Sequence, residues 1–253
     1  MVPERAGAGQ GGLRRISHWW ALLGERGFAL PLVLLAGVSL AGWVFVEVAG
    51  DVIEGDTLAL DRALLLALRD PRDPSDPLGP WWVEVMMRDI TALGSTAVLA
   101  LFALAAVGYL LLAGKWGSAL LVTASISGGL VASQLLKLWI ERPRPDLVPH
   151  GTQVLTLSFP SGHATMSAVV YLTLGVLLAG LQPSRRMAAY ILAVALLLTG
   201  LVGFSRVYLG VHWPTDVLAG WALGSAWALL CLLVSMALRL RAGQAPVASA
   251  GRP

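Results

Sequence analysis

The chain has 253 residues, of which 57% are hydrophobic and only 13% are charged. Soluble domains carry about 25% charged residues, so this composition and a mean hydropathy of +0.73 exclude an ordinary soluble protein and indicate a polytopic membrane protein. A single cysteine, Cys231, excludes a disulfide within the chain. The net charge of +3 does not indicate nucleic-acid binding, because the basic residues are divided among separate loops and form no stripe.

Six apolar blocks are long enough to cross about 30 Å of hydrocarbon. We therefore expect an all-α fold, a polytopic membrane protein with six transmembrane helices. The fifth block is the shortest, and it is included partly because the topology requires it. The blocks are Phe28–Ala49, Ala92–Ala113, Gly117–Trp139, Ala164–Leu181, Met187–Gly203 and Val217–Leu238.

The distribution of lysine and arginine between the loops predicts the orientation. Placing the N-terminus in the cytoplasm collects most basic loop residues there and leaves the acid-rich stretch 51–89 outside. Residues 1–27 are then a cytoplasmic segment, residues 28–238 the membrane domain and residues 239–253 a disordered cytoplasmic tail. The first block is too long for a signal-peptide core, which makes it an uncleaved anchor in the cell (inner) membrane.

The connection over residues 50–91 is too long for a simple turn, and we expect an extracytoplasmic helical cap there. Segment Asp56–Arg69 has the apolar period of an amphipathic helix on the membrane surface. The sequence DPRDPSDPLGP (70–80) ends it, and Trp81 and Trp82 are suited to the membrane interface. Two interpretations remain open: a plain surface cap, or a lid that borders the access route of a lipid substrate.

Three short polar stretches interrupt the apolar blocks at helix ends: KLWIERPRP (137–145), PSGH (160–163) and SRVYLGVHWPTD (205–216). Charged groups beside membrane helices are energetically costly and are often functional. In the six-helix topology all three stretches lie on the extracytoplasmic face. Their shared face predicts one common site.

The composition of these stretches favours a tetrahedral oxyanion as ligand. Lys137, Arg144 and Arg206 supply three cations, and arginine presents a planar fork that matches phosphate oxygens. Ser161 is suited to cap a helix whose free N–H groups attract an anion, and Gly162 permits close backbone approach. We therefore predict that these five residues bind phosphate.

Two histidines and one carboxylate supply the predicted chemistry. His212 and Asp216 are four residues apart across a helix start, so the carboxylate can accept the Nδ1 proton and leave the other ring nitrogen free to attack. His163, on the other helix, can protonate the leaving oxygen as a general acid. The catalytic residues predicted are thus His212, His163 and Asp216.

Simpler interpretations compete with this one. Each histidine alone is more often a capping residue, and Lys137 and Arg206 alone can be anchors that extend to the membrane interface. A His/His/Asp metal site is disfavoured because three nearby cations would repel a metal ion. Arg142 competes with Arg144 for the phosphate, or else pairs with Glu141 or lipid headgroups. His18 and His150 lie outside the motifs and are interpreted as loop residues. Gly220 and Gly224 have the spacing of a helix-packing pair.

Together the three stretches resemble the type 2 phosphatidic acid phosphatase superfamily. The family signature is Lys-x6-Arg-Pro, Pro-Ser-Gly-His and Ser-Arg-x5-His-x3-Asp, and every position is filled here in order. The resemblance implies a metal-independent phosphatase without a cofactor, which acts through a phosphohistidine. The implied roles are His212 as nucleophile, Asp216 as its orienting partner, His163 as the acid, and as phosphate ligands Lys137, Arg144, Ser161, Gly162 and Arg206.

The function expected is an integral membrane lipid phosphatase that removes a phosphomonoester or terminal pyrophosphate from a lipid. The candidate substrates are phosphatidylglycerophosphate, phosphatidic acid and undecaprenyl diphosphate, which belong to phospholipid metabolism and the cell envelope. Two alternatives are a lipid phosphotransferase and an anionic-lipid transporter. A transporter would place charge at the membrane midplane, whereas the charges here lie at helix ends. The oligomeric state is not predicted.

Overall fold

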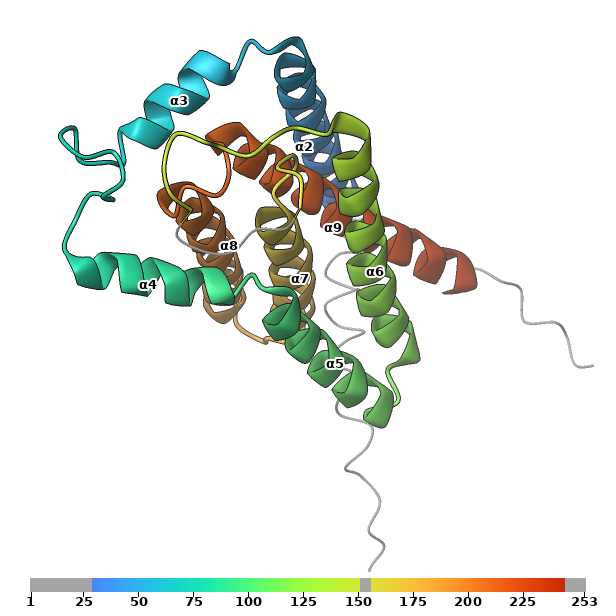
Figure 1. Cartoon of the computed structure of the whole chain (residues 1–253). Coiled ribbons are helices and arrows are strands. Elements are labelled where there is room, and N and C mark those ends of the chain that lie inside the picture. Colours follow the sequence, from blue (N-terminus) through green and yellow to red (C-terminus); the bar gives the residue numbers. More distant parts are fainter. Residues whose placement is uncertain (1–28, 151–155, 244–253) are drawn as a thin grey trace, which may run out of the picture.

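The computed structural model describes residues 29–150 and 156–243, and within these ranges the chain is all-helical, without a strand. Predictions for residues 1–27, His18 included, therefore lie outside the described residues, as does most of the predicted tail. The last helix continues to Gly243, beyond the predicted domain end. Figure 1 shows the helices, which are α2 (Ala29–Glu54), α3 (Leu58–Leu66), α4 (Trp81–Ala92), α5 (Thr96–Leu112), α6 (Trp116–Ile140), α7 (Gly162–Ala179), α8 (Arg185–Tyr208) and α9 (Pro214–Gly243).

The membrane-spanning helices match the predicted blocks. Within the described residues, five helices are long and apolar enough to cross a membrane, and α4 with α5 forms a sixth candidate bent by 44°. The predicted span Ala92–Ala113 corresponds to α5, which has 17 residues. The fifth span is longer than predicted, because α8 continues to Tyr208. The all-α membrane fold is thus confirmed.

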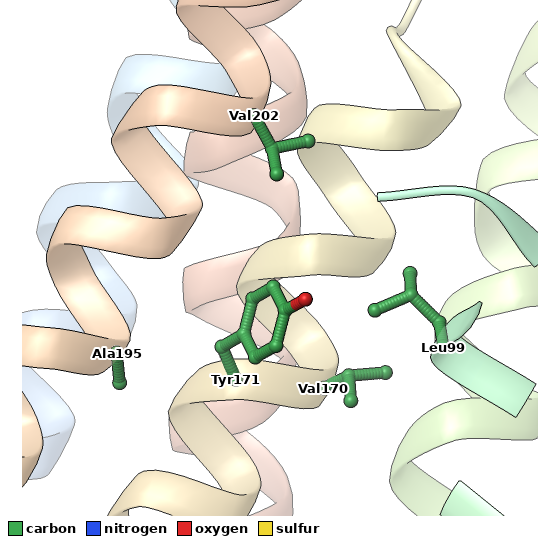
Figure 2. Close-up of a cluster of buried hydrophobic side chains, with 5 residues drawn as sticks. All are labelled: Leu99, Val170, Tyr171, Ala195 and Val202. Atoms are coloured by element: carbon green, nitrogen blue, oxygen red, sulfur yellow. The ribbon is translucent and has the colours of Figure 1, made fainter. Parts of the chain in front are cut away.

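Helix α7 lies at the centre of the bundle, in contact with α5, α6, α8 and α9. Figure 2 shows one cluster of this core, where Val170 and Tyr171 of α7 meet Leu99 of α5 and Ala195 and Val202 of α8. The Tyr171 hydroxyl donates to the Leu93 carbonyl at 2.8 Å. This bond ties α7 to the bend between α4 and α5.

Small residues allow α7 and α9 to approach closely. A Cβ atom added at Gly220 would lie 2.9 Å from the Ser161 carbonyl oxygen, and one at Gly224 would lie 2.4 Å from that of Thr165. The predicted packing role of this glycine pair is confirmed. Its consequence is functional, since it places the start of α7 directly beside the start of α9.

Helix α3 carries the predicted amphipathic segment, although it is shorter than predicted. Its leucine stripe faces away from the protein, with Leu60 57% exposed and Leu64 46% exposed, as expected for a helix that rests on a membrane surface. The opposite face turns Asp61, Leu65 and the following Arg69 inward, and all three are buried. In Figure 1, α3 lies across the end of the bundle at which α9 begins.

Candidate active site

The three motif stretches meet at one end of the helical bundle. The first leaves the C-terminal end of α6, the second begins α7, and the third joins α8 to α9. The Ser161 amide donates to the Asp216 carbonyl at 2.9 Å, and the Lys137 Cε atom lies 3.8 Å from the position of a Cβ at Gly162. Long-range packing therefore brings together residues up to 79 positions apart, from Lys137 to Asp216.

His212 lies in the turn between α8 and α9, and its side chain is 2% exposed. Nε2 lies 3.0 Å from Arg144 Nη1. Because arginine only donates hydrogen bonds, Nε2 holds the lone pair and Nδ1 carries the proton. Nδ1 in turn lies 3.4 Å from Asp216 Oδ2 and 3.3 Å from Ser158 Oγ.

The surroundings of His212 favour the neutral ring. Burial lowers its pKa to about 3, Arg144 and Arg206 act in the same direction, and Asp216 opposes them. A histidine whose pKa is lowered this far is neutral at physiological pH. Its Nε2 lone pair is therefore available, beside a cation that can bind the other reactant.

Asp216, in the first turn of α9, is fully buried and accepts hydrogen bonds on both carboxylate oxygens. Oδ1 accepts from Arg142 Nη1 at 2.7 Å. Oδ2 accepts from the Trp213 amide at 3.0 Å and from the Ser158 hydroxyl, and it faces His212. A carboxylate held by this many donors has one fixed orientation. Ser158 was not predicted, although it stands two residues before the PSGH motif.

The predicted cations are also anchored individually. Arg144 donates to the carbonyls of Thr156 and Val211, each at 2.6 Å, and burial lowers its pKa. Lys137 Nζ donates to the Leu157 carbonyl at 2.7 Å. These contacts leave the positive charge of both side chains without a carboxylate partner among the described residues.

Arg206, in the last turn of α8, is 4% exposed, and its Nη1 donates to Thr91 Oγ1 at 2.9 Å. Its Nε atom is buried without a hydrogen-bond partner in the described part of the chain. An unpaired buried donor on a cation is costly. The orphan Nε is therefore a donor available to an anionic ligand.

The start of α7 has the predicted form. Ser161 is the N-cap, and its hydroxyl accepts from the Ala164 amide at 3.5 Å. His163 follows in the first turn, within electrostatic range of Lys137, Arg144 and Arg206. Its ring packs near Gly94, in the bend between α4 and α5. Every predicted site residue thus lies in one cluster.

One prediction was wrong. Arg142 does not pair with Glu141 or project towards lipid: it forms buried ion pairs of 2.7 Å with Asp216 and with Asp61 of α3. Glu141 ends α6 in a left-handed conformation (φ 51°) and is exposed, so the chain reverses and Arg142 points inward.

His150 is a loop residue as predicted, with Nε2 2.7 Å from the Pro145 carbonyl. No group of three or more metal-ligating side chains occurs within residues 29–150 and 156–243.

Comparison with known proteins gives one consistent result. Residues 97–239 match the model of the PAP2 superfamily. Phosphatidylglycerophosphatase B of Bacillus subtilis is 37% identical over 147 residues, which cover 56% of this chain and 70% of that protein. Lipid A 1-phosphatase of Rhizobium etli is 34% identical over 129 residues, which cover 47% of this chain and 51% of that protein.

The likeness extends to three-dimensional structure. The crystal structure of a transmembrane PAP2-type phosphatidylglycerolphosphate phosphatase from Bacillus subtilis superposes with a TM-score of 0.66 at 28% identity, covering 79% of this chain and 96% of that one. The family match, these relatives and the membrane fold agree, and the chain belongs to the PAP2 superfamily of membrane lipid phosphatases.

Proposed function

We propose that this protein removes a phosphoryl group from a membrane lipid through a phosphohistidine at His212. The observation that carries the proposal is the arrangement of the His212 ring. One nitrogen faces Asp216, and the other lies 3.0 Å from Arg144. A phosphate group that binds Arg144 in place of this contact would hold its phosphorus atom close to the Nε2 lone pair, in position for attack.

The reaction proceeds in two steps. In the first, the Nε2 lone pair attacks phosphorus, the bond from phosphorus to the leaving oxygen breaks, and His163 donates a proton to that oxygen. Asp216 stabilises the positive charge that develops on His212. In the second, His163 takes a proton from water, the water oxygen bonds to phosphorus, and the phosphorus–nitrogen bond breaks to release inorganic phosphate.

The cations stabilise the transferring group. Lys137, Arg144 and Arg206 lie within electrostatic range of His163, and the first turn of α7, which begins at Gly162, offers its N–H groups. Fixed donors aimed at the equatorial oxygens lower the barrier to phosphoryl transfer. The orphan Nε of Arg206 supports this role most directly.

The substrate proposed is a phosphomonoester or terminal pyrophosphate on a lipid, with phosphatidylglycerophosphate, phosphatidic acid and undecaprenyl diphosphate as candidates. Relatives named for phosphatidylglycerophosphate and for lipid A share the feature of a phosphate on a lipid. We place the site on the extracytoplasmic face of the cell membrane with both chain ends in the cytoplasm. The excess of basic residues in the opposite loops supports this orientation.

A substrate panel on purified protein tests the proposal. The three candidate lipids and a soluble phosphate ester are compared with and without EDTA, for the wild type and for His212→Ala. We expect phosphate release that EDTA does not reduce and that His212→Ala abolishes while the variant elutes as a folded protein in detergent. Undiminished turnover by His212→Ala would refute the proposal. Labelled lipid products, separated by thin-layer chromatography, distinguish transfer to water from transfer to another lipid.

A further inference from the structure

A buried carboxylate outside the family-matched segment is connected to the candidate active site. Asp61 belongs to α3, whereas the family match begins at residue 97. Its side chain is 0% exposed. A buried charge is tolerated only when it is paired and hydrogen-bonded. The partners of Asp61 therefore show what it holds in place.

Within the described residues, the hydrogen-bond partners of the Asp61 side-chain oxygens are Thr215, which precedes Asp216, and Arg142, which pairs with Asp216. Oδ1 accepts from the Thr215 amide at 3.0 Å, and Oδ2 accepts from the Thr215 hydroxyl at 2.7 Å. Oδ2 also accepts from Arg142 Nη2 at 2.7 Å. An acidic side chain at the N-terminus of α9 is stabilised there by the free amides and the helix dipole.

Arg142 joins this carboxylate to Asp216. Its Nη2 binds Asp61 while its Nη1 binds Asp216 Oδ1 at 2.7 Å and Thr215 Oγ1 at 2.8 Å. The guanidinium also lies over the Trp213 ring, 5.6 Å from its centroid. The Arg142 guanidinium is thus shared between two carboxylates: Nη1 binds Asp216 and Nη2 binds Asp61.

The sharing determines how Asp216 meets His212. If Asp61 were absent, Arg142 Nη2 would keep only the Thr57 hydroxyl, at 3.2 Å, and could turn to form a bidentate pair with Asp216. Such a pair would engage Oδ2, the oxygen that faces His212 Nδ1. With Asp61 in place, Arg142 takes only Oδ1. Oδ2 then remains for the Trp213 amide, the Ser158 hydroxyl and His212.

We propose that Asp61 is a positioning residue for phosphoryl transfer, which acts through Arg142 and Thr215 to keep one oxygen of Asp216 directed at His212. This inference rests on the proposed function, because it assigns Asp61 a part in the chemistry of His212. Helix α3 then does more than cover the bundle, because it carries a residue that helps to orient the nucleophile His212.

The test compares Asp61→Asn with Arg62→Gln in purified full-length protein. Both variants remove one charge from α3, but Arg62 is exposed. We expect Asp61→Asn to lower kcat by about 10- to 100-fold with KM within about threefold of wild type, as for a misplaced catalytic group. Arg62→Gln should leave both constants within about twofold. A kcat of Asp61→Asn equal to that of Arg62→Gln would overturn the proposal.

A double-mutant comparison separates positioning from general destabilisation. In an Asp216→Asn background, the further change Asp61→Asn should lower kcat by less than about threefold. Asp61 is proposed to act only by orienting the Asp216 carboxylate, which is already absent in that background. A full additional loss in that background would show that Asp61 acts independently, and would overturn the proposal. A soluble ester with a good leaving group keeps the residual rates measurable.

Arg142→Lys gives a second test that does not require Asp61→Asn to fold. Lysine keeps the charge but cannot bridge two carboxylates with a planar fork. We expect a loss of kcat similar to that of Asp61→Asn, and wild-type kcat in Arg142→Lys would contradict the proposal. Failure here is distinct from failure of the proposed function: an inactive His212→Ala beside a fully active Asp61→Asn would refute only the role of Asp61.

Discussion

Two regions of the chain surround His212, and they differ in chemistry rather than in burial. The motif segments 137–145, 160–163 and 205–216 supply the groups proposed to contact phosphate. The stretch 57–94 supplies contacts one step further out: Asp61 binds Arg142, Thr91 binds Arg206, and Gly94 packs against His163. Asp61 and Asp216 are both 0% exposed. Burial therefore does not distinguish a reacting group from a support, whereas the hydrogen-bond partners do.

The largest difference between the regions should appear at His163. Its replacement by Asn should lower kcat/KM on an alkyl phosphate by about 10²- to 10⁴-fold, because the leaving oxygen then departs without a proton. On p-nitrophenyl phosphate, whose leaving group needs no proton, the loss of kcat/KM, which reports only the first step, should be much smaller. Steady-state rates on the two substrates measure the effect. Equal losses on both would contradict the role of general acid.

Arg206 and Thr91 compare a proposed ligand with its support directly. Arg206→Lys should lower kcat/KM by about 100-fold, since a fixed donor to the transferring group is lost. Thr91→Val should lower it by only about 5- to 20-fold, because one guanidinium nitrogen loses its acceptor. Thr123→Val, on an exposed position of α6, is the control. A Thr91 variant as impaired as the Arg206 variant would remove the distinction between the regions.

The two regions also differ in how far sequence reveals them. The motif residues are recognisable because phosphoryl transfer needs particular residue types at fixed spacing, and their common face follows from counting spans. Asp61 carries no such signal, since its partners Arg142 and Thr215 are 81 and 154 positions away. The leucines of α3 predicted its exposed side, but the role of the opposite face depends on tertiary packing. The turn at Glu141, which directs Arg142 inward, was likewise not predictable.

Gly94, in the stretch 57–94, contacts His163 by close packing. A Cβ at this position would lie 2.3 Å from Val202 Cγ1 and 3.2 Å from His163 Cδ2, so Gly94→Ala must displace α8 or the histidine. We expect a loss of stability of about 1–3 kcal/mol together with a lower kcat. At Gly108, inside α5, a Cβ meets nothing within 4 Å, so Gly108→Ala should leave kcat unchanged and should not lower stability, since alanine favours a helix by up to about 1 kcal/mol over glycine. Thermal unfolding in detergent and steady-state kinetics check both variants.

The last prediction concerns stability alone, through its dependence on pH. The pKa of His212 is 6.5 in the unfolded chain and about 3 in the folded one, so between these values the unfolded state binds the extra proton. Its contribution therefore lowers the free energy of unfolding as pH falls below 6.5, with a slope of up to about 1.4 kcal/mol per pH unit. His212→Asn should flatten the curve between pH 4 and 6, about the middle of this range. Identical pH profiles for the two proteins would show that His212 does not remain neutral.

Trapping the covalent intermediate is the most direct test for a phosphohistidine at His212. Wild-type protein is mixed with a ³²P-labelled lipid phosphate and quenched in alkali, in which phosphohistidine survives, and the labelled peptide is then sequenced. We expect label on the peptide that contains His212, and none in His212→Ala. Label on another residue of the wild type, or label retained by His212→Ala, would contradict a phosphohistidine at His212.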